Sequence, residues 1–580
     1  MKKLYPLISV AVMLVMLLSA CTAPVAETVA APAEAAAPTE AAAPTEAPAP
    51  TEAPAPTEAA APTEAAAPTE AAAPTDADKS GGTLNVVIRL KDYETLDPHT
   101  TNLTQAAYIF KAIYDKLIFM EGAKFYPGLA TSWTPNKDFT AWTMTLRKGV
   151  TFHDGSPFNS KVMAFNFDRM KDPATKSLAA GSEVGPYDYT EIVDDYTGIV
   201  HFSTPYALFD VALTSDYMSM ISMEQAMKVG SDKFRDNPVG TGPFKYVSQI
   251  SATEVVLEKN PDYNWAPEFM QHQGAPYLDK IIFNFAIEDE ARLGALETGE
   301  ANIVDNLPPL RIQGLIDAGF QVFDIRRPGL PRMANLNTKA FPTDDILVRK
   351  ALNFAKNPEV IEKTVTKGFF PDARNVIALG SNYYDTAAEL YNYDPAKAVS
   401  LLEEAGYTKV NADGYRVKNG KVLEMLYYTF ADQQAELTAE AFQAMMKEVG
   451  IKVNVEVVPG KLLYSIAEEG SKVNASFIGT GAPDPGQPLI SFFHSEGKGR
   501  TQYSQFIDEE LDTLMYAGME TNDPVKRQGI YSKIQMKIME NALVVPLTVT
   551  VMRWAAQPQV MGFHLDPYPH PYFYDVYLAK

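Results

Sequence analysis

Pairs of carboxylates and the histidines are the side chains in this sequence that could do acid–base or metal chemistry. Acidic residues are adjacent at 194–195, 288–290 and 468–469, an arrangement that two-carboxylate glycosidases could use. The chain has 72 acidic residues, however, so neighbouring carboxylates are expected by chance. We therefore interpret these pairs as solvated surface.

The seven histidines could supply metal ligands or a general base. Only His564 and His570 are close in sequence, and prolines and aromatic residues surround them. Metal-binding motifs place histidines at fixed, short spacings, as in the His-Glu-x-x-His of a zinc-binding helix, and no such motif occurs here. We expect a packed loop around His564 and His570, and the sequence predicts neither a metal site nor a cofactor.

Two glycine-rich turns could approach a phosphate closely, but neither belongs to a complete motif. They are Gly240-Thr241-Gly242 and Gly479-Thr480-Gly481, and neither continues into a P-loop or a Gly-x-Gly-x-x-Gly fingerprint. The Gly-x-Ser-x-Gly elbow of serine hydrolases is also missing from the sequence. Tight turns are the simpler interpretation, and no catalytic residues are predicted.

Composition and charge restrict the class of protein further. Apolar residues make up 46% of the chain and aromatic residues 11%, which is enough to build large cores. The formal net charge is −22, whereas binding to nucleic acid or to anionic lipid requires a basic surface. We therefore exclude these two kinds of partner as the primary function.

Cys21 is the only cysteine, and its surroundings predict export. Two lysines precede an apolar run from Leu4 to Leu18, and the small residues Ser19 and Ala20 follow it. This is the three-part layout of a secretory signal, and the run is short for a membrane span of about 20 residues. A transmembrane helix and an ordinary cleaved signal are the alternatives. The layout resembles the lipobox of bacterial lipoproteins, so we predict that residues 1–20 are removed and that Cys21 is lipidated.

The next segment, through residue 80, reads as a spacer. Between Pro38 and Pro74 proline recurs every six residues within the repeat Ala-Ala-Ala-Pro-Thr-Glu. The repeat has no side chain that could build a core, so an extended acidic tether is expected. Residues 81–580 exceed the size that one hydrophobic core usually organises, which predicts at least two lobes.

Hydrophobic periodicity within 81–580 predicts a mixture of helices and strands. The segment 83–88 and the alternating residues 142–147 read as strands. A strand, a helix and a strand follow one another at 423–430, 433–449 and 451–457, a β-α-β unit with parallel strands. The fold class is therefore α/β.

Seven stretches carry a family resemblance. They are 125–133, 142–157, 238–244, 257–263, 335–338, 348–352 and 393–398. Their residues and order resemble the family 5 extracellular solute-binding proteins, which serve ABC importers for oligopeptides, dipeptides, nickel complexes and some oligosaccharides. The resemblance covers essentially all of 81–580.

This resemblance implies a two-lobed α/β fold of the periplasmic-binding-protein type (type II, large cluster C), with a ligand cleft between the lobes. Lobe I would comprise 81–330 plus 545–580, and lobe II 331–544. The protein would be a monomer outside the cell membrane that captures a short peptide or an oligosaccharide by closure. It would then deliver this solute to an ABC permease and ATPase.

One departure from the family pattern bears on the ligand. Peptide-binding members usually place an aspartate just before a Pro-Asp-Pro-like stretch of lobe II, where it pairs with the ligand's α-ammonium. Alignment on 483–485 puts Gly481 at that position. A buried ammonium without a carboxylate is costly. The departure therefore disfavours an ordinary peptide unless Asp484 substitutes.

The predicted ligand wall is the segment after the strand 475–478, because open α/β sheets bind ligands beyond the carboxyl ends of their strands. Its residues are Gly479, Thr480, Gly481, Ala482, Pro483 and Asp484. A plain turn is the alternative for this segment. Trp265 and Trp554 are candidate stacking platforms for a sugar, with core packing as the alternative.

Two other functions remain open from the sequence. One is a secreted hydrolase of glycans or peptides, and the other is a ligand-presenting sensor subunit of the same fold. A permease and an ATPase encoded beside the gene would favour the importer.

Changing Cys21 to serine should release the protein from the membrane, because the thiol is the predicted site of lipidation. The measurement is the fraction of protein that sediments with membranes, together with the N-terminal residue of the mature chain. Equal attachment of the variant and the wild type, or a mature chain that begins elsewhere, would contradict the prediction.

Overall fold

The computed structural model describes residues 76–580 apart from 92–93, 123, 251–252, 460–461, 463–471, 483 and 496–503. The predicted signal, Cys21 and most of the spacer therefore lie outside the described residues. Residues 73–580 form one compact unit. Among the described helices, none combines the length and the apolar character that a membrane crossing requires.

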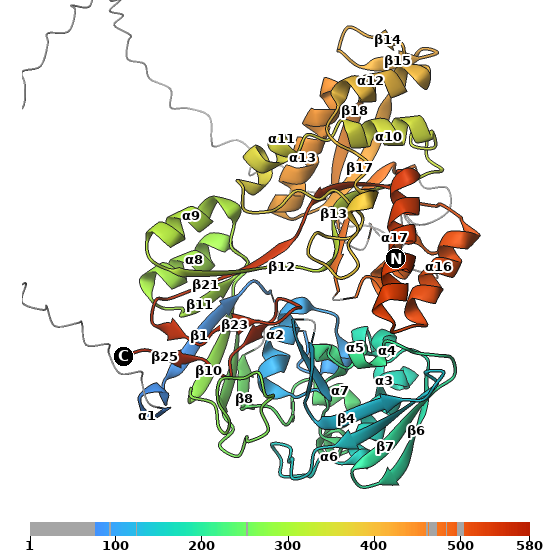
Figure 1. Ribbon diagram of the computed structural model, residues 1–580. Coiled ribbons are helices and arrows are strands. Elements are labelled where there is room, and N and C mark those ends of the chain that lie inside the picture. Colours follow the sequence, from blue (N-terminus) through green and yellow to red (C-terminus); the bar gives the residue numbers. More distant parts are fainter. Residues whose placement is uncertain are drawn as a thin grey trace, which may run out of the picture. The chain divides into compact units, whose positions relative to one another are not determined.

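The largest sheet has seven strands in the order β12-β21-β11-β1-β10-β9-β8 (Figure 1). In that order the strands are Gln321–Arg326, Val551–Ala556, Ile303–Asp305, Thr83–Ile88, Lys280–Phe285, Glu254–Lys259 and Phe244–Ile250. The central strand β1 pairs in parallel with β10 and β11, while the other pairs are antiparallel. The predicted first strand at 83–88 is confirmed.

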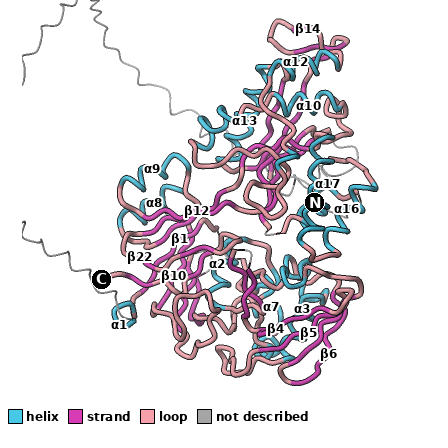
Figure 2. Tube along the Cα trace, in the orientation of Figure 1, coloured by secondary structure: helices cyan, strands magenta, loops and turns pink. Residues whose placement is uncertain are grey.

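Both faces of this sheet are covered, because successive side chains of a strand point to opposite sides. On one face Leu84, Val86 and Ile88 belong to the same buried cluster as helix α2 (Thr104–Ile113). On the other face Val87 packs with α8 (Asp289–Thr298) and α9 (Pro309–Asp317). Figure 2 shows α8 and α9 beside β12, away from α2.

A second, antiparallel sheet lies in the same half of the chain and has the order β4-β5-β7-β6. Its strands are Ala130–Pro135, Ala141–Leu146, Thr197–Phe202 and Tyr187–Asp194. Trp142, Met144 and Leu146 are buried while Thr143 and Thr145 are exposed, so the predicted alternation is confirmed. Helix α3 (Ser160–Lys171) packs against this sheet and begins at Asn159, whose side chain accepts from two backbone N–H groups.

The five-stranded sheet has the order β18-β17-β19-β13-β20. Its strands are Lys452–Val458, Glu424–Phe430, Ala475–Gly481, Gly329–Leu336 and Val544–Thr548. β17 pairs in parallel with β18 and with β19, and α13 (Gln433–Glu448) connects β17 to β18. The predicted β-α-β unit is therefore confirmed.

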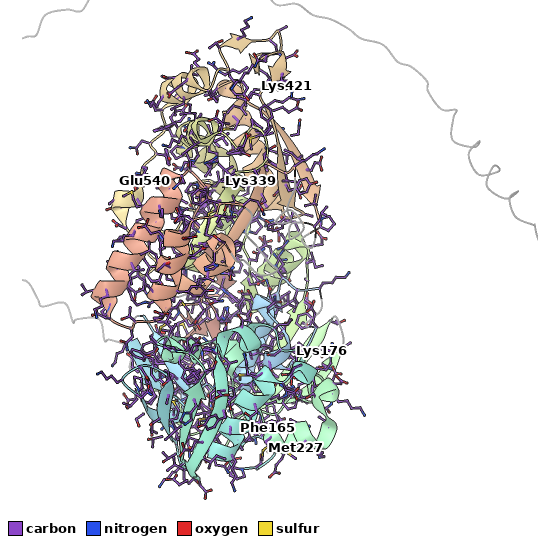
Figure 3. All side chains as sticks on the ribbon, turned by 90° about the vertical axis from the view of Figure 1, so that its right-hand side faces the viewer. Phe165, Lys176, Met227, Lys339, Lys421 and Glu540 are labelled. Atoms are coloured by element: carbon purple, nitrogen blue, oxygen red, sulfur yellow. The ribbon has the colours of Figure 1, made fainter. Side chains whose placement is uncertain are left out.

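Helices cover both faces of the five-stranded sheet. On one face are α10 (Ile346–Phe354), α12 (Pro395–Glu404) and α13, and on the other are α15 (Gly486–Phe493), α16 (Glu509–Met519) and α17 (Pro524–Glu540). Asp394 caps α12 and Pro395 is its first residue, as the sequence predicts. In Figure 3, Lys339, Lys421 and Glu540 mark this half of the fold, and Phe165, Lys176 and Met227 mark the half with the antiparallel sheet.

Short elements complete the described chain. Before β12 they are α1 (Asp76–Lys79), η1 (Pro98–Thr100), β2 (Ile118–Glu121), β3 (Lys124–Pro127), η2 (Pro173–Thr175), α4 (Ala179–Glu183), α5 (Phe209–Ala212), η3 (Asp216–Met218), α6 (Met223–Val229) and α7 (Ser231–Phe234). After β13 they are α11 (Pro358–Ile361), η4 (Glu362–Thr366), η5 (Thr386–Ala388), β14 (Lys409–Val410), β15 (Arg416–Lys418) and β16 (Lys421–Val422). After β21 they are β22 (Val560–Met561), β23 (His564–Leu565), β24 (Pro571–Tyr572) and β25 (Tyr577–Leu578).

Two short segments join the five-stranded sheet to the seven-stranded one. Residues 327–328 connect β12 to β13, and 549–550 connect β20 to β21. The Arg327 N–H donates to the Thr550 carbonyl oxygen over 2.8 Å, so the two segments are tied to each other.

The sheets place the lobe boundaries differently from the sequence. The sequence assigns residues from 545 onward to lobe I, but β20 pairs with β13 in the five-stranded sheet. The whole of β20 is buried, so its apolar pattern does not reveal which sheet it joins. We propose that the lobes meet at 327–328 and 549–550, with the seven- and four-stranded sheets in lobe I and the five-stranded sheet in lobe II.

Candidate functional site

A cavity of about 340 Å³ lies between residues of the two lobes. Lobe I contributes residues of α4, of the segment 206–217 and of the loop between β23 and β24. Lobe II contributes the end of β19 and part of α15, and the crossing segment contributes Arg327 and Pro328. Ligand sites usually have volumes of about 300–1,000 Å³, so this cavity suits a small solute.

Four residues of the predicted ligand wall line this cavity, namely Thr480, Gly481, Ala482 and Asp484. Gly479 is exposed and is not among the lining residues, and Pro483 lies outside the described residues. Because β19 runs parallel to β17, its carboxyl end lies where ligands of α/β sheets commonly bind. The wall stays a prediction, and its position in the cavity supports it.

Arg327 occupies the space above Gly481. A Cβ atom added to Gly481 would lie 2.6 Å from both Cγ and Cδ of Arg327, and closer still to Nε. Only a glycine therefore leaves room for this arginine in its present position. Gly329 brings the two strands together, since its φ of +110° and its contact with the backbone of residue 482 suit glycine alone.

The carboxylate of Asp484 already has a partner within lobe II. It lies 2.6 Å from Arg527 Nη2 in α17, and it also accepts from the Gly486 N–H over 2.9 Å. Arg527 is held further by the hydroxyl groups of Tyr383 and Tyr531. Asp484 is therefore not available as the substitute for the aspartate of peptide-binding members.

Glu183 is the acidic residue of the cavity that has no cationic partner among the described residues. It ends α4, and its Oε2 is buried without a hydrogen bond in the described part of the chain. Burial raises the pKa of its carboxyl to about 8, although Ser215 and Lys116 act in the opposite direction. Other titratable groups near it are Asp216, Tyr206, Tyr217 and Tyr568.

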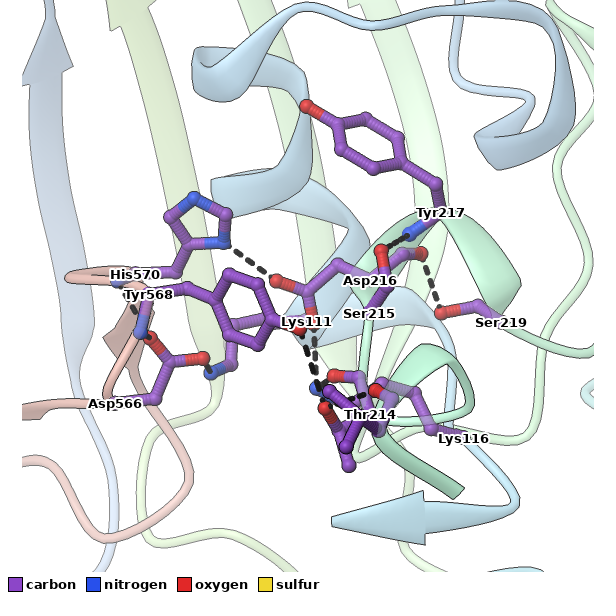
Figure 4. Close-up of polar contacts among 11 residues, drawn as sticks. Lys111, Lys116, Thr214, Ser215, Asp216, Tyr217, Ser219, Asp566, Tyr568 and His570 are labelled. Carbon is purple, nitrogen blue, oxygen red and sulfur yellow. Dashed lines mark hydrogen bonds and ion pairs between the residues drawn. The ribbon is translucent and has the colours of Figure 1, made fainter. Parts of the chain in front are cut away.

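The lobe I floor of the cavity is a network of balanced charges (Figure 4). Asp216 accepts from His570 Nδ1 over 2.6 Å and from Lys116 Nζ over 2.8 Å. Lys111 of α2 pairs with Asp566. Burial would by itself raise the pKa of Asp216, but the two lysines and His570 outweigh it and hold that pKa well below its usual range. The network fixes the C-terminal loop against η3.

The same network is the one described group that could hold a metal ion. Ligand atoms of Asp216, Asp566 and His570 lie within 4.8 Å of one another. Lys111 and Lys116 already neutralise the two carboxylates, however, and a cation placed among them would be repelled. The donor set therefore does not fit a metal site.

The two candidate stacking tryptophans lie in the core of lobe I. Trp265 is 5% exposed, and its Nε1 donates to the buried carboxylate of Asp115 over 2.9 Å. Trp554 is fully buried in β21 and packs against the ring of Tyr108, with centroids 4.9 Å apart. Neither lines the cavity, so the core alternative describes their positions. Trp554 belongs to one buried hydrophobic cluster of lobe I, and Trp265 belongs to another.

A comparison with family models decides the family. The model for bacterial extracellular solute-binding proteins, family 5 Middle, matches residues 124–500. The chain belongs to this family. It is the substrate-binding protein of an ABC importer and not an enzyme, as the resemblance implies, and the hydrolase alternative is dropped. The family also implies an extracytoplasmic location, a permease partner and a small solute.

Relatives of known structure or function share nearly the whole of the body. The glutathione-binding protein GsiB of Salmonella choleraesuis (strain SC-B67) is 28% identical over 488 residues, which are 82% of this chain and 91% of the relative. The periplasmic binding protein DppA of Helicobacter pylori, in complex with the peptide STSA, is 26% identical with a TM-score of 0.71. The match covers 87% of this chain and 99% of DppA.

The fold is also that of NikA from Brucella suis in complex with Fe(III)-EDTA, with a TM-score of 0.77 and 24% identity. This match covers 86% of this chain and 100% of NikA. The two-lobed α/β fold expected from the sequence is confirmed.

Several cavity residues were missed by the sequence analysis, above all Arg327 and Glu183. Neither belongs to a motif: Arg327 lies in the short segment between β12 and β13, and Glu183 is the last residue of the short helix α4. His570 is buried in a packed loop, as expected, but it also lines the cavity. The one available signal was Gly481, whose lack of a side chain indicates that another group approaches there.

Replacing Trp265 by phenylalanine should destabilise lobe I without weakening solute binding. The change removes one of the three side-chain donors to the buried Asp115, the others being Thr241 and Tyr263. The free energy of unfolding should fall by about 1–3 kcal/mol. Urea unfolding measures this, with Trp133→Phe on the less buried strand β4 as the matched control. Weaker solute binding at unchanged stability would instead place Trp265 at the ligand.

The raised pKa of Glu183 should appear as a pH-dependent stability. In the unfolded chain its pKa is about 4.3, so between about pH 5 and 8 the folded protein holds the extra proton. The stabilisation that the protonated Glu183 carboxyl gives to the folded protein is therefore fully present below pH 4, and it is lost as the pH rises through 8. Between pH 5 and pH 8.5 the wild type should therefore lose on the order of 4 kcal/mol of its free energy of unfolding through this group, a loss that Glu183→Gln should not show.

Urea unfolding at pH 5, 7 and 8.5 measures this difference. Glu224→Gln, at an exposed position of α6, is the matched control and should follow the wild type. An identical pH dependence in wild type and Glu183→Gln would show that the carboxyl is not protonated at neutral pH.

Proposed function

We propose that this protein is a lipid-anchored, monomeric binding protein that captures a short peptide between its two lobes and delivers it to an ABC permease. The observation that carries the proposal is the cavity of about 340 Å³, which both lobes and the crossing segment line. Its size suits a solute of two or three residues better than a long chain.

The comparisons favour a peptide over an oligosaccharide. DppA was solved in complex with a peptide, and GsiB is a glutathione-binding protein. Two features of the sequence favoured a sugar, the pair of tryptophans and Gly481 at the position of the aspartate. Both tryptophans lie in the core, which leaves Gly481 as the remaining feature that disfavours an ordinary peptide. Tyr206, Tyr217 and Tyr568 line the cavity and would suit either ligand. An oligosaccharide is therefore the alternative.

Anchoring through Cys21 supports capture close to the membrane. The acidic spacer would keep the body near the permease while letting it move. A sensor subunit would use the same cavity and anchor, and the presence of a permease and an ATPase beside the gene distinguishes the two roles.

Closure about the crossing segments is the proposed mechanism of capture. The lobes are joined at 327–328 and 549–550, and hinges of this kind allow rigid-body closure. Interactions at two places across the proposed boundary between the lobes support this mechanism. Arg89, after β1, lies 3.4 Å from Asp432, the N-cap of α13. Burial raises the pKa of Asp210 in α5 to about 6, and two charges of lobe II also act on it, Arg527 lowering the pKa and Asp484 raising it. Solute contacts to both lobes would stabilise the closed form.

Native mass spectrometry with a mixture of unmodified tripeptides, and separately with a mixture of neutral trisaccharides, tests the ligand class. We expect tripeptides to be retained and trisaccharides not to be. Small-angle scattering with the retained tripeptides should show a smaller radius of gyration than without them, with the mass of a monomer in both cases. Retention of trisaccharides alone would show that the ligand is an oligosaccharide and not a peptide. Identical scattering curves with a tripeptide bound would contradict closure.

A further inference from the structure

Resting on the proposed function, we propose that the cavity recognises a zwitterionic solute with its charges in a defined orientation. Arg327 holds a carboxylate of the solute above Gly481, and Glu183 holds its ammonium group on the lobe I side. The orientation is opposite to the one that the resemblance implies, in which lobe II supplies a carboxylate for the ammonium at the position of Gly481.

The first support is the inventory of charges around the cavity. Apart from tyrosines, the described lining side chains that carry or can carry a charge are Glu183, Asp216, Arg327, Asp484 and His570. Asp216 is paired with His570 and a lysine, and Asp484 is paired with an arginine. In the described part of the chain no ion pair involves either of the remaining two, Glu183 and Arg327. They are the two charges that a solute can satisfy.

The position of Arg327 makes it a site for an anion. Burial lowers the pKa of its guanidinium, and the neighbouring groups that affect this pKa are the phenols of Tyr108 and Tyr217 rather than a carboxylate. Arg332 lies close enough that Arg327 contributes to lowering its pKa, after burial. Arg332 is paired with Asp432 over 3.8 Å, so Arg327 is the arginine here whose charge no described carboxylate pairs with. A guanidinium binds a carboxylate with two parallel hydrogen bonds.

Gly481 is the second part of this site. Arg327 lies across the glycine, where any side chain would collide with its Cγ and Cδ atoms. The aspartate of peptide-binding members, placed here, would both displace the arginine and neutralise it. Gly481 therefore makes room for the unpaired Arg327. At the place where peptide-binding members have a negative aspartate, this protein has a positive guanidinium.

Glu183 supplies the opposite charge from lobe I. Glu183 lines the same cavity, and its Oε2 is buried and has no hydrogen bond among the described residues. A buried carboxylate without a partner is costly, so the group is held as a neutral acid until a cation arrives. The raised pKa of Glu183, about 8, fits this state. An ammonium group would draw the proton off and pair with the carboxylate.

The binding should therefore depend on pH with a definite sign. Because the ammonium favours the charged carboxylate, binding releases a proton from Glu183 and affinity should rise between pH 6 and 8. Above pH 8 the α-amino group of a peptide, with a pKa of about 7.7–8.0, loses its own proton and affinity should fall. Asp216 and Lys116 face Glu183 and pair with each other, and the pKa of Asp216 stays well below this window because the two lysines and His570 outweigh the effect of its burial.

The test uses one mixture of tripeptides in three forms, with free termini, with a C-terminal amide and with an N-terminal acetyl group. Binding to the whole exported protein is measured by native mass spectrometry. One retained tripeptide is then measured by titration calorimetry. We expect the amide and the acetylated form to bind at least tenfold more weakly than the free form.

Variants assign each end of the peptide. Arg327→Gln should bind the free form at least tenfold more weakly than the wild type does, and it should bind the free and amidated forms equally. Arg327→Lys should keep part of the preference for the free form over the amidated form. Glu183→Gln should bind the free and acetylated forms equally. Its affinity for the free form should not rise between pH 6 and 8. Gly481→Ala should act like Arg327→Gln, because the methyl group displaces the arginine. Arg326→Gln and Glu224→Gln, at exposed positions nearby and in α6, are the matched controls. Thermal unfolding of each variant confirms that it is folded.

The outcomes separate this inference from the proposed function. Equal binding of free and amidated tripeptides to the wild type, or an undiminished preference in Arg327→Gln, overturns the orientation and leaves a peptide-binding protein. Binding of neutral trisaccharides without any tripeptide overturns both.

Discussion

Two antiparallel chain segments cross between the lobes, and the hydrogen bond from Arg327 N to the carbonyl of Thr550 joins them. β12 and β13 are consecutive in the chain, as are β20 and β21, and each pair of neighbours continues from one sheet into the other. The seven- and five-stranded sheets are therefore parts of one hydrogen-bonded ribbon at this point. The cavity depends on this constraint, since residues on either side of the ribbon line it.

Around the cavity, electrostatics divides the polar groups into those that hold the fold and those left for a solute. The buried carboxylates of Asp216 and Asp566 each have a lysine, and removing one partner of such a pair leaves an uncompensated charge in the interior. Similarly, the ion pair of Asp484 and Arg527 connects the segment between β19 and α15 to α17. These pairs fix the walls. Arg327 and Glu183 stand out because the described fold does not use their charges.

The sequence predicted the elements of this fold better than it predicted the residues of the cavity. Periodicity located β1, β5 and the β17-α13-β18 unit, because each repeats an apolar side chain at the interval of its own secondary structure. It did not assign β20 to its sheet, since a strand buried on both faces lacks alternation.

The candidate site was predicted in part for a similar reason. The predicted wall comprises the last residues of β19 and the residues that follow, and a general rule places ligands at the carboxyl ends of such strands. Trp265 and Trp554 were candidates by residue type alone, and type does not tell a core indole from an exposed one. Arg327 and Glu183 come together only through contacts between segments far apart in the chain, which neither composition nor spacing encodes.

The location of Arg327 on the crossing segment has a consequence for the order of events in capture. A residue on the axis of a hinge moves little when the lobes rotate, so it presents the same surface in the open and the closed protein. In the proposed closure, residues of α4 would travel with lobe I. A solute can therefore dock first on the stationary segment and meet the moving wall afterwards, so encounter and enclosure become two separate kinetic steps. The rate of the first is set by diffusion and the rate of the second by the rotation of the lobes.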